Sequence, residues 1–286
     1  MKRSLLVTVV ILAIFGFAGQ ALAASAIVRL GEALYKDPNL SKNLNQSCMT
    51  CHHPLAGFAD TSNHVDPLNS PNSDGSDPAF FGGRNAPSAA YAGFVPALDC
   101  IDDEGLFCTG GMFWDGRATG RDDFTDTAGI AVSVPYPDLS ADGSGPKEVT
   151  GATMDPLADQ AKGPFQNPVE MALTPDRVIS TVLNSNYTKL FKQAFGYKIA
   201  TEVMTNAPGV YNDIAIAIAA FERSAELNKF SSKFDQFAKE QAKKRIDVST
   251  IALDNGVVVD GSGKLVKSRV FMQEELEGLA LFNMPN

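Results

Sequence analysis

The feature that most constrains this chain is a pair of cysteines followed at once by a histidine. Cys48, Cys51 and His52 form the pattern C-x-x-C-H. Two thiols at this spacing can form thioether bonds to the two vinyl groups of one haem, and the next residue then brings an imidazole to the iron. The pattern therefore predicts a covalent haem c, with Cys48 and Cys51 as attachment sites and His52 as the proximal axial ligand.

The N-terminus predicts the compartment. Lys2 and Arg3 precede an apolar run from Leu5 to Ala18, and Ala21-Leu22-Ala23 closes it. This is the pattern of a secretory signal peptide, and the run is shorter than the ~20 residues of a spanning helix. We expect residues 1–23 to be removed, and the remaining 286 − 23 = 263 residues to be periplasmic without a membrane span.

Two other kinds of cysteine site compete with haem attachment. A thioredoxin-like pair requires a βαβ setting, of which the sequence shows no sign. A four-cysteine zinc site would have to recruit Cys100 and Cys108. Because an exported chain enters an oxidising compartment, a local disulfide between Cys100 and Cys108 is the simpler expectation.

The net charge limits the partners. The chain carries a formal charge of −9, and nucleic acid is therefore excluded as a partner. The same negative field would attract a basic redox protein, although it also fits a merely soluble acidic surface.

The apolar spacing predicts a mostly α-helical chain with long loops. Helical patterns surround Leu30 and Leu34, and Ile214 and Ile218, while Thr174-Pro175 is a typical helix start. Polar, Gly- and Pro-rich stretches interrupt them, one over residues 61–83 and an inserted loop over about residues 121–155. Gly31 is expected where a neighbour packs too closely for a larger side chain.

A short internal echo predicts two related modules. Gly31-Glu32-Ala33-Leu34-Tyr35 is answered by Gly278-Leu279-Ala280-Leu281-Phe282. Only the first copy is followed by a C-x-x-C-H pattern. We expect residues from about Lys229 to be an unfinished second module, in which Leu276, Leu279 and Phe282 lack apolar partners.

With one haem motif in place, the chain resembles the bacterial dihaem cytochrome c peroxidase and MauG family. The resemblance covers nearly all of the mature chain. It implies a c-type cytochrome-like peroxidatic haem domain over residues 24–228 and the incomplete start of a second cytochrome c-like domain over residues 229–286. The matching stretches are Leu30 to Asp60, Gly83-Arg84-Asn85-Ala86-Pro87-Ser88, Phe113-Trp114-Asp115-Gly116-Arg117, Gln160 to Met171 and Ala219-Ala220-Phe221-Glu222-Arg223.

The resemblance also implies the residues of a peroxide site. In the family a Gln and a Glu ten residues apart line the open side of the N-terminal haem, and a Pro lies between them. Gln160, Pro164 and Glu170 have this spacing. A carboxylate there can move a proton between the two peroxide oxygens while the amide orients peroxide or water.

Further roles are implied for single residues. Trp114 resembles an electron relay between two haems, and Asn85 resembles a ligand of a structural calcium. Members with a distal histidine place it eight residues before this Asn, where this chain has Asp77. His64 is a candidate distal ligand or a solvated loop residue, so the iron is expected to be open at rest.

The resemblance leaves three functions to compare. The first is reduction of hydrogen peroxide to water, with electrons from a small cytochrome c or cupredoxin. The second is MauG-like oxidation of a partner protein, and the third is electron transfer by a single haem without catalysis. We expect one haem c in this chain and two in the complete protein, and the family leaves a homodimer open.

Overall fold

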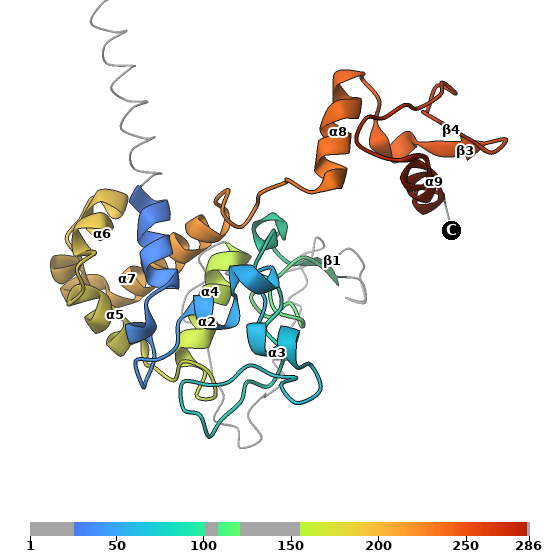
Figure 1. The fold of residues 1–286 in the computed structure, drawn as a ribbon. Helices are drawn as coiled ribbons and strands as arrows, with labels where there is room; N and C mark the ends of the chain where they lie inside the picture. The colour runs from blue at the N-terminus through green and yellow to red at the C-terminus, as the bar shows by residue number, and fades with distance from the viewer. Residues whose placement is uncertain (1–25, 101–107, 121–154, 285–286) are drawn as a thin grey trace, which may run out of the picture. The chain divides into compact units, whose positions relative to one another are not determined.

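The structure is a computed structural model that describes residues 26–100, 108–120 and 155–284. The expected signal peptide lies outside the described residues, as does nearly all of the expected insertion. The chain divides into two compact units between Asn228 and Lys229 (Figure 1). The first contains the C-x-x-C-H pattern and the second contains the C-terminal helix.

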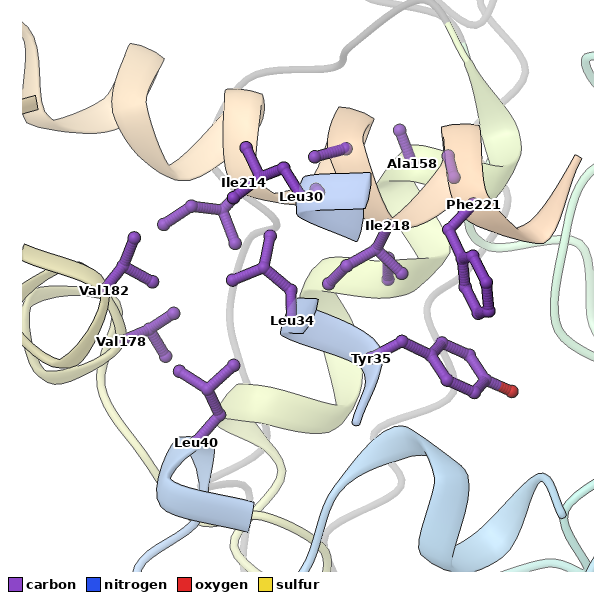
Figure 2. Close-up of a cluster of buried hydrophobic side chains, with 14 of the residues drawn as sticks. Leu30, Leu34, Tyr35, Leu40, Ala158, Val178, Val182, Ile214, Ile218 and Phe221 are labelled. Atoms are coloured by element: carbon purple, nitrogen blue, oxygen red, sulfur yellow. The ribbon is translucent and has the colours of Figure 1, made fainter. Parts of the chain in front are cut away.

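The core of the first unit forms where an N-terminal helix, residues 26–35, packs against α7, Ile199–Glu222. Leu30 and Leu34 are fully buried in this contact (Figure 2). A Cβ atom on Gly31 would lie 1.8 Å from the carbonyl oxygen of Ala217, so only glycine allows the two helices to approach this closely. The expectation for Gly31 is therefore confirmed.

Three further helices pack against α7: α4 (Pro156–Gln166), α5 (Pro175–Leu183) and α6 (Thr188–Phe195). The expected start of α5 is confirmed, because Thr174 accepts a hydrogen bond from the N–H of Arg177 and proline occupies the first turn. α7 itself is kinked at Asn206, two residues before Pro208.

Long loops with short elements carry the chain from the N-terminal helix to α4. The two-stranded ladder sets Cys100 opposite Cys108, and Cys108 is disulfide-bonded. This register is the one that the expected disulfide requires. The short elements are η1 (Pro38–Leu40), α2 (Cys48–Cys51), η2 (Pro54–Ala56), α3 (Thr61–Val65), η3 (Ala92–Phe94), β1 (Asp99–Cys100) and β2 (Cys108–Thr109).

The second unit has a small core of its own. Its elements are α8 (Lys233–Lys243), η4 (Val248–Thr250), the antiparallel pair β3 (Ala252–Asp254) and β4 (Val257–Val259), and α9 (Gln273–Phe282). Leu276 is buried against Phe237 and Val258, and Leu279 packs on this cluster. The expectation that both lack partners was wrong, because the β3–β4 hairpin and α8 cover them. Phe282 is 86% exposed.

The prediction of a mostly α-helical chain with long loops is confirmed. Within the described ranges, no helix is both long enough and apolar enough to span a membrane.

Candidate functional site

A single helical turn presents the two cysteines of the C-x-x-C-H pattern. α2 begins after Ser47, whose N–H donates to Thr50 Oγ1 at 2.9 Å, and it ends at His52, whose N–H donates to the carbonyl of Cys48 at 2.9 Å. Residues three apart lie on one face of such a turn. Both thiols are free and half-buried. They therefore lie on one face of α2, and His52 is the next residue in the sequence.

Burial keeps the two thiols neutral. It raises the pKa of the Cys51 thiol to about 11 and that of Cys48 still further, and the nearby Glu222 carboxyl adds to the shift at Cys48. A thioredoxin-like pair needs the opposite, a thiol whose pKa is lowered. The environment therefore disfavours a thiol redox role and suits sulfur atoms that end in thioether bonds.

Two backbone carbonyls fix the ring of His52. Its Nδ1 lies 2.9 Å from the carbonyl oxygen of Pro87 and 3.2 Å from that of Phe58. Because a carbonyl oxygen only accepts, Nδ1 must carry the proton in these bonds, and the lone pair is then on Nε2. Burial also lowers the pKa of His52. Both effects favour a neutral imidazole with Nε2 available to a metal.

A buried amide beside the cysteines has an unmet hydrogen bond. Gln46 Nε2 donates to the carbonyl of Asp74 at 2.6 Å and to Cys51 Sγ at 3.4 Å. Its Oε1 is buried and, among the described residues, accepts no hydrogen bond. Such an orphaned acceptor usually marks a missing partner. With the two thiols and the oriented His52, it shows that these residues fit a covalently attached haem.

The turn after α4 carries Glu170 into the same site. Its backbone is tied at both sides, because the N–H of Met171 donates to the carbonyl of Pro164 at 3.2 Å and the N–H of Ser76 donates to the carbonyl of Glu170 at 2.7 Å. Its carboxyl acts electrostatically on both Cys48 and Cys51. Glu170 therefore lies within electrostatic range of the cysteine pair.

Burial and hydrogen bonding have opposite effects on the pKa of Glu170. Burial raises the pKa of this carboxyl, and the opposing effects of the Asn167 hydrogen bond and the Arg117 charge only partly offset the rise. Asn167 Nδ2 donates to Oε1 at 2.7 Å. A raised pKa makes a carboxyl a stronger base, which suits a residue that has to take up and return a proton.

Gln160 and Pro164 lie one helical turn apart on α4. Pro164 has no N–H to donate to the carbonyl of Gln160, so the helix ladder is interrupted between them. The amide of Gln160 is half-buried and, within the described ranges, forms no side-chain hydrogen bond that would commit it elsewhere. It remains a candidate for orienting a small ligand.

The other expected site residues lie at the surface. Trp114 is 93% exposed, so it is not a core tryptophan in the described chain. Asn85 is exposed and donates to Asn63 Oδ1 at 3.0 Å, while His64 is exposed in the last turn of α3. Their relay, calcium and distal-ligand roles stay predictions.

Two further observations concern metals and the distal position. Among the residues that the structure describes, no group of three or more His, Cys, Asp and Glu side chains is placed to hold a metal ion. Asp77, which the family resemblance aligns with the distal histidine of some members, forms an ion pair with Lys42 at 3.3 Å.

Sequence reasoning missed Gln46 and Asn167. The role of Asn167 could have been predicted, because an Asn three residues before a Glu in a tight turn can donate a hydrogen bond to the Glu carboxylate. Gln46 could not, since its position depends on the carbonyl of Asp74 in a distant loop.

Comparisons with known proteins identify the family of this chain. A family model described as di-haem cytochrome c peroxidase matches residues 25–243. The methylamine utilization protein MauG of Paracoccus denitrificans is 32% identical over 231 residues, which cover 80% of this chain and 48% of that protein. The cytochrome c551 peroxidase of Pseudomonas aeruginosa is 30% identical over 211 residues, covering 73% of this chain and 41% of that protein.

A solved structure shows the same likeness. A variant of the diheme peroxidase BthA from Burkholderia thailandensis superposes with a TM-score of 0.54 and 25% identity, over 76% of this chain and 43% of that one. The chain thus spans less than half the length of each of these relatives. The family match extends from the N-terminal helix through α8 and includes every residue of the candidate site. The chain therefore belongs to the di-haem cytochrome c peroxidase family, a family of haem-containing oxidoreductases.

Proposed function

We propose that this chain is the peroxide-reacting part of a periplasmic c-type haem peroxidase. One hydrogen peroxide, two protons and two electrons give two waters, and a small redox protein such as a cytochrome c or a cupredoxin supplies the electrons. One observation carries the proposal. His52 Nδ1 is held by two carbonyls, with Nε2 left over, beside two free thiols that lie within electrostatic reach of Glu170.

The residues at the site divide the work. Cys48 and Cys51 would hold a haem through thioether bonds, and His52 Nε2 would be its proximal ligand. When bound, haem supplies the iron at which peroxide is reduced. The paired carbonyls of Phe58 and Pro87 keep the His52 ring in one orientation and one tautomer, which also makes the imidazole a stronger donor.

Proton transfer falls to one oxygen of Glu170. Oε1 is committed to Asn167, whereas Oε2 accepts no hydrogen bond from the residues that the structure describes. Oε2 would take a proton from one peroxide oxygen and return it to the other, which leaves as water. Gln160 would orient the peroxide through its amide. An electron carrier has no use for such a carboxyl, and this favours the enzyme over the carrier.

The proposal is tested on holoprotein made in a host that attaches haem c. Glu170→Gln is expected to slow the stopped-flow reaction with hydrogen peroxide by about 100- to 10,000-fold, because general acid–base assistance is lost. Haem retention should not change. Glu32→Gln, which removes a partly exposed carboxylate paired with Lys36 at 2.6 Å, is the matched control.

Two results would contradict the proposal. One is wild-type protein that carries no haem after denaturation. The other is an unchanged peroxide rate in Glu170→Gln with its haem intact, which would make Glu170 a structural residue.

A further inference from the structure

Three segments that lie far apart in the sequence meet at Ser76, which is fully buried. Its N–H donates to the carbonyl of Glu170 at 2.7 Å. Its carbonyl oxygen accepts from Asn43 Nδ2 and from Asn45 Nδ2, both at 2.9 Å. Its hydroxyl donates to Asn45 Oδ1 at 2.8 Å and accepts from the N–H of Asn43 at 2.9 Å. Ser76 therefore joins the segment before α2 to the turn that carries Glu170.

These bonds give every polar group of Ser76 a partner. A backbone N–H donates one hydrogen bond, and a carbonyl oxygen has two lone pairs, both of which are used here. The hydroxyl donates its single proton and accepts in return. Moving such a buried group would leave donors or acceptors without partners, so a fully paired network resists displacement. Ser76 therefore makes a rigid connection between the segments.

Two more contacts hold the turn that carries Glu170. An added Cβ on Gly75 would lie 2.6 Å from the carbonyl oxygen of Val169, so the loop crosses the turn with the two backbones in contact. The N–H of Lys42 donates to the carbonyl of Met171 at 2.8 Å. The residues on both sides of Glu170 are therefore held by the same two segments.

The segment before α2 leads directly to the expected haem attachment site. Gln46, at its end, donates from Nε2 to Cys51 Sγ at 3.4 Å and to the carbonyl of Asp74 at 2.6 Å. The loop is thus tied to this segment twice, at Asp74 and at Ser76. These hydrogen bonds connect the backbone of Glu170 to the attachment cysteine Cys51.

We propose that Ser76 is a positioning residue for the peroxide reaction, which fixes the place of the Glu170 carboxyl relative to the attachment site at Cys51. The inference rests on the proposed function of Glu170. A carboxyl that passes a proton between two peroxide oxygens must lie within hydrogen-bonding reach of both, and a misplacement of about 1 Å can cost about 100-fold in rate. Ser76 acts through the backbone of Glu170 and needs no contact with peroxide.

The test is a double-mutant cycle in holoprotein that combines Ser76→Ala with Glu170→Gln. Alone, Ser76→Ala removes both hydrogen bonds of the hydroxyl and should slow the stopped-flow reaction with hydrogen peroxide by about 10- to 100-fold. In the Glu170→Gln background the same substitution should change the rate less than about twofold, because the carboxyl that Ser76 positions is already gone. A merely structural defect would slow both backgrounds by the same factor.

Two measurements without peroxide separate positioning from general damage. Carbon monoxide binds reduced haem without proton transfer, so its association rate in Ser76→Ala should stay within about twofold of wild type. Hydrogen exchange at the N–H of residue 76 should become about tenfold faster, because the loop has lost two hydrogen bonds to residues 43–45.

Ser185→Ala is the matched control for the loss of a serine hydroxyl. Ser185 Oγ also donates one hydrogen bond and accepts one, to the carbonyl of Val182 at 2.6 Å and from the N–H of Tyr187 at 3.4 Å. These contacts lie at the end of α5 and include no part of the Glu170 turn. The peroxide rate of Ser185→Ala should therefore stay within about twofold of wild type.

Asn43→Ala decides the question if Ser76→Ala does not retain haem. Asn43 is exposed, and this variant takes only one donor from the Ser76 carbonyl, so a slowing of about 3- to 10-fold is expected, again only where Glu170 is present.

Four results would overturn the inference alone. They are a wild-type peroxide rate in Ser76→Ala, equal slowing in the two Glu170 backgrounds, equal slowing in Ser185→Ala, and a carbon monoxide rate that falls as far as the peroxide rate. An unchanged peroxide rate in Glu170→Gln would instead overturn the proposed function on which the inference rests.

Discussion

Among the residues that the structure describes, only the first of the two units has carboxyl groups whose pKa is raised by burial. In the first unit burial raises the pKa of Glu170, and it raises that of Glu222 to about 8. In the second unit the perturbed carboxyl groups of the described residues all have lowered pKa values, held down by hydrogen bonds and ion pairs. These are Asp235, Glu240, Asp247, Asp260 and Glu275.

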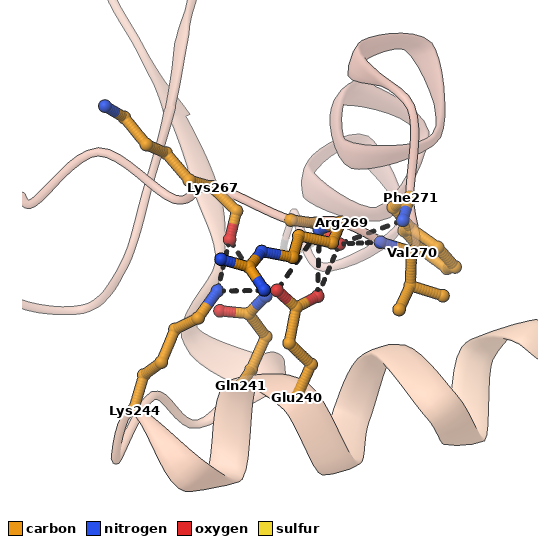
Figure 3. A network of polar contacts seen from close by, with 8 residues as sticks. Glu240, Gln241, Lys244, Lys267, Arg269, Val270 and Phe271 are labelled. Atoms are coloured by element: carbon orange, nitrogen blue, oxygen red, sulfur yellow. Dashed lines mark hydrogen bonds and ion pairs between the residues drawn. The ribbon is translucent and has the colours of Figure 1, made fainter.

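Glu240 shows what the second unit does with a carboxylate. It accepts from Lys244 Nζ at 2.9 Å, from Ser268 Oγ at 2.7 Å and from the N–H of Arg269 at 3.1 Å (Figure 3). These bonds, with Lys244 first, lower its pKa to about 2. They fasten the segment before α9 to α8, so the carboxylate is structural.

This difference in pKa indicates which carboxyl groups are expected to take part in proton transfer. A carboxyl whose pKa is raised by burial is held in a state that can exchange a proton, whereas one lowered by several partners is locked in its charged form. An unpaired buried atom alone is a weaker sign. Gln241 Oε1 in the second unit is also buried and unpaired among the described residues, but its amide meets only the carbonyl of Lys267, whereas that of Gln46 meets a free thiol.

The largest expected effect removes the attachment site. The double substitution Cys48→Ala and Cys51→Ala should abolish covalent haem entirely, because no thioether can then form. Haem retained on the chain after denaturing electrophoresis measures this. The second unit supplies the control, since Glu240→Gln should keep all of its haem. Covalent haem in the double variant would show that Cys48 and Cys51 are not the attachment site, and the comparison of the two units would then lose its basis.

Features set by residues close together in the sequence could be predicted, whereas features set by residues far apart in the sequence could not. The start of α5 at Thr174 and the close approach at Gly31 were predictable, because a cap is local and a glycine in an apolar helix face has few explanations. The C-x-x-C-H pattern was recognisable in the sequence because the chemistry of haem attachment fixes its spacing.

The electrostatics of the site were not predictable in the same way. The clamp on His52 uses the carbonyl of Pro87, thirty-five residues away. The stack of Arg117 on the ring of Phe113 depends on a backbone conformation that this residue type disfavours. The partners of Leu276 were missed even though Asn255-Gly256, followed by three valines, is a typical hairpin signal. The sequence does not show that this hairpin packs against the helix that carries Leu276.

The second prediction concerns Glu222, which is 5% exposed with an Oε2 that has no hydrogen-bond partner among the described residues. Burial raises its folded pKa from 4.5 to about 8, so its contribution to stability is full below pH 4.5 and is lost as the pH rises through 8. The stability of Glu222→Gln relative to wild type should therefore increase between pH 4.5 and 8.5, by on the order of 1–4 kcal/mol.

Denaturant unfolding of the holoprotein at both pH values measures this change. Glu226→Gln, at a half-exposed carboxylate near Lys36, is the control and should show little pH-dependent difference. A relative stability of Glu222→Gln that is constant with pH would remove Glu222 from the set of groups that burial perturbs.

The smallest expected effect is at Glu240, which tests the comparison on a carboxylate of the second unit. The folded pKa of Glu240 lies near 2, below the usual 4.5, so its stabilising contribution is present above pH 4.5 and is lost as the pH falls through about 2. Glu240→Gln should speed hydrogen exchange at the backbone N–H of Arg269 at pH 7, because a neutral amide accepts less strongly than a carboxylate. This difference from wild type should shrink towards pH 2.

Glu277→Gln, which loses only a contact with Gln273 within α9, is the control and should leave hydrogen exchange at the N–H of Arg269 unchanged. The peroxide rate should stay within about twofold of wild type, since surface substitutions away from a site rarely reach it. A slowing comparable to that of Glu170→Gln would show that the second unit's carboxylates also serve the reaction, and the contrast between the two units would then not hold.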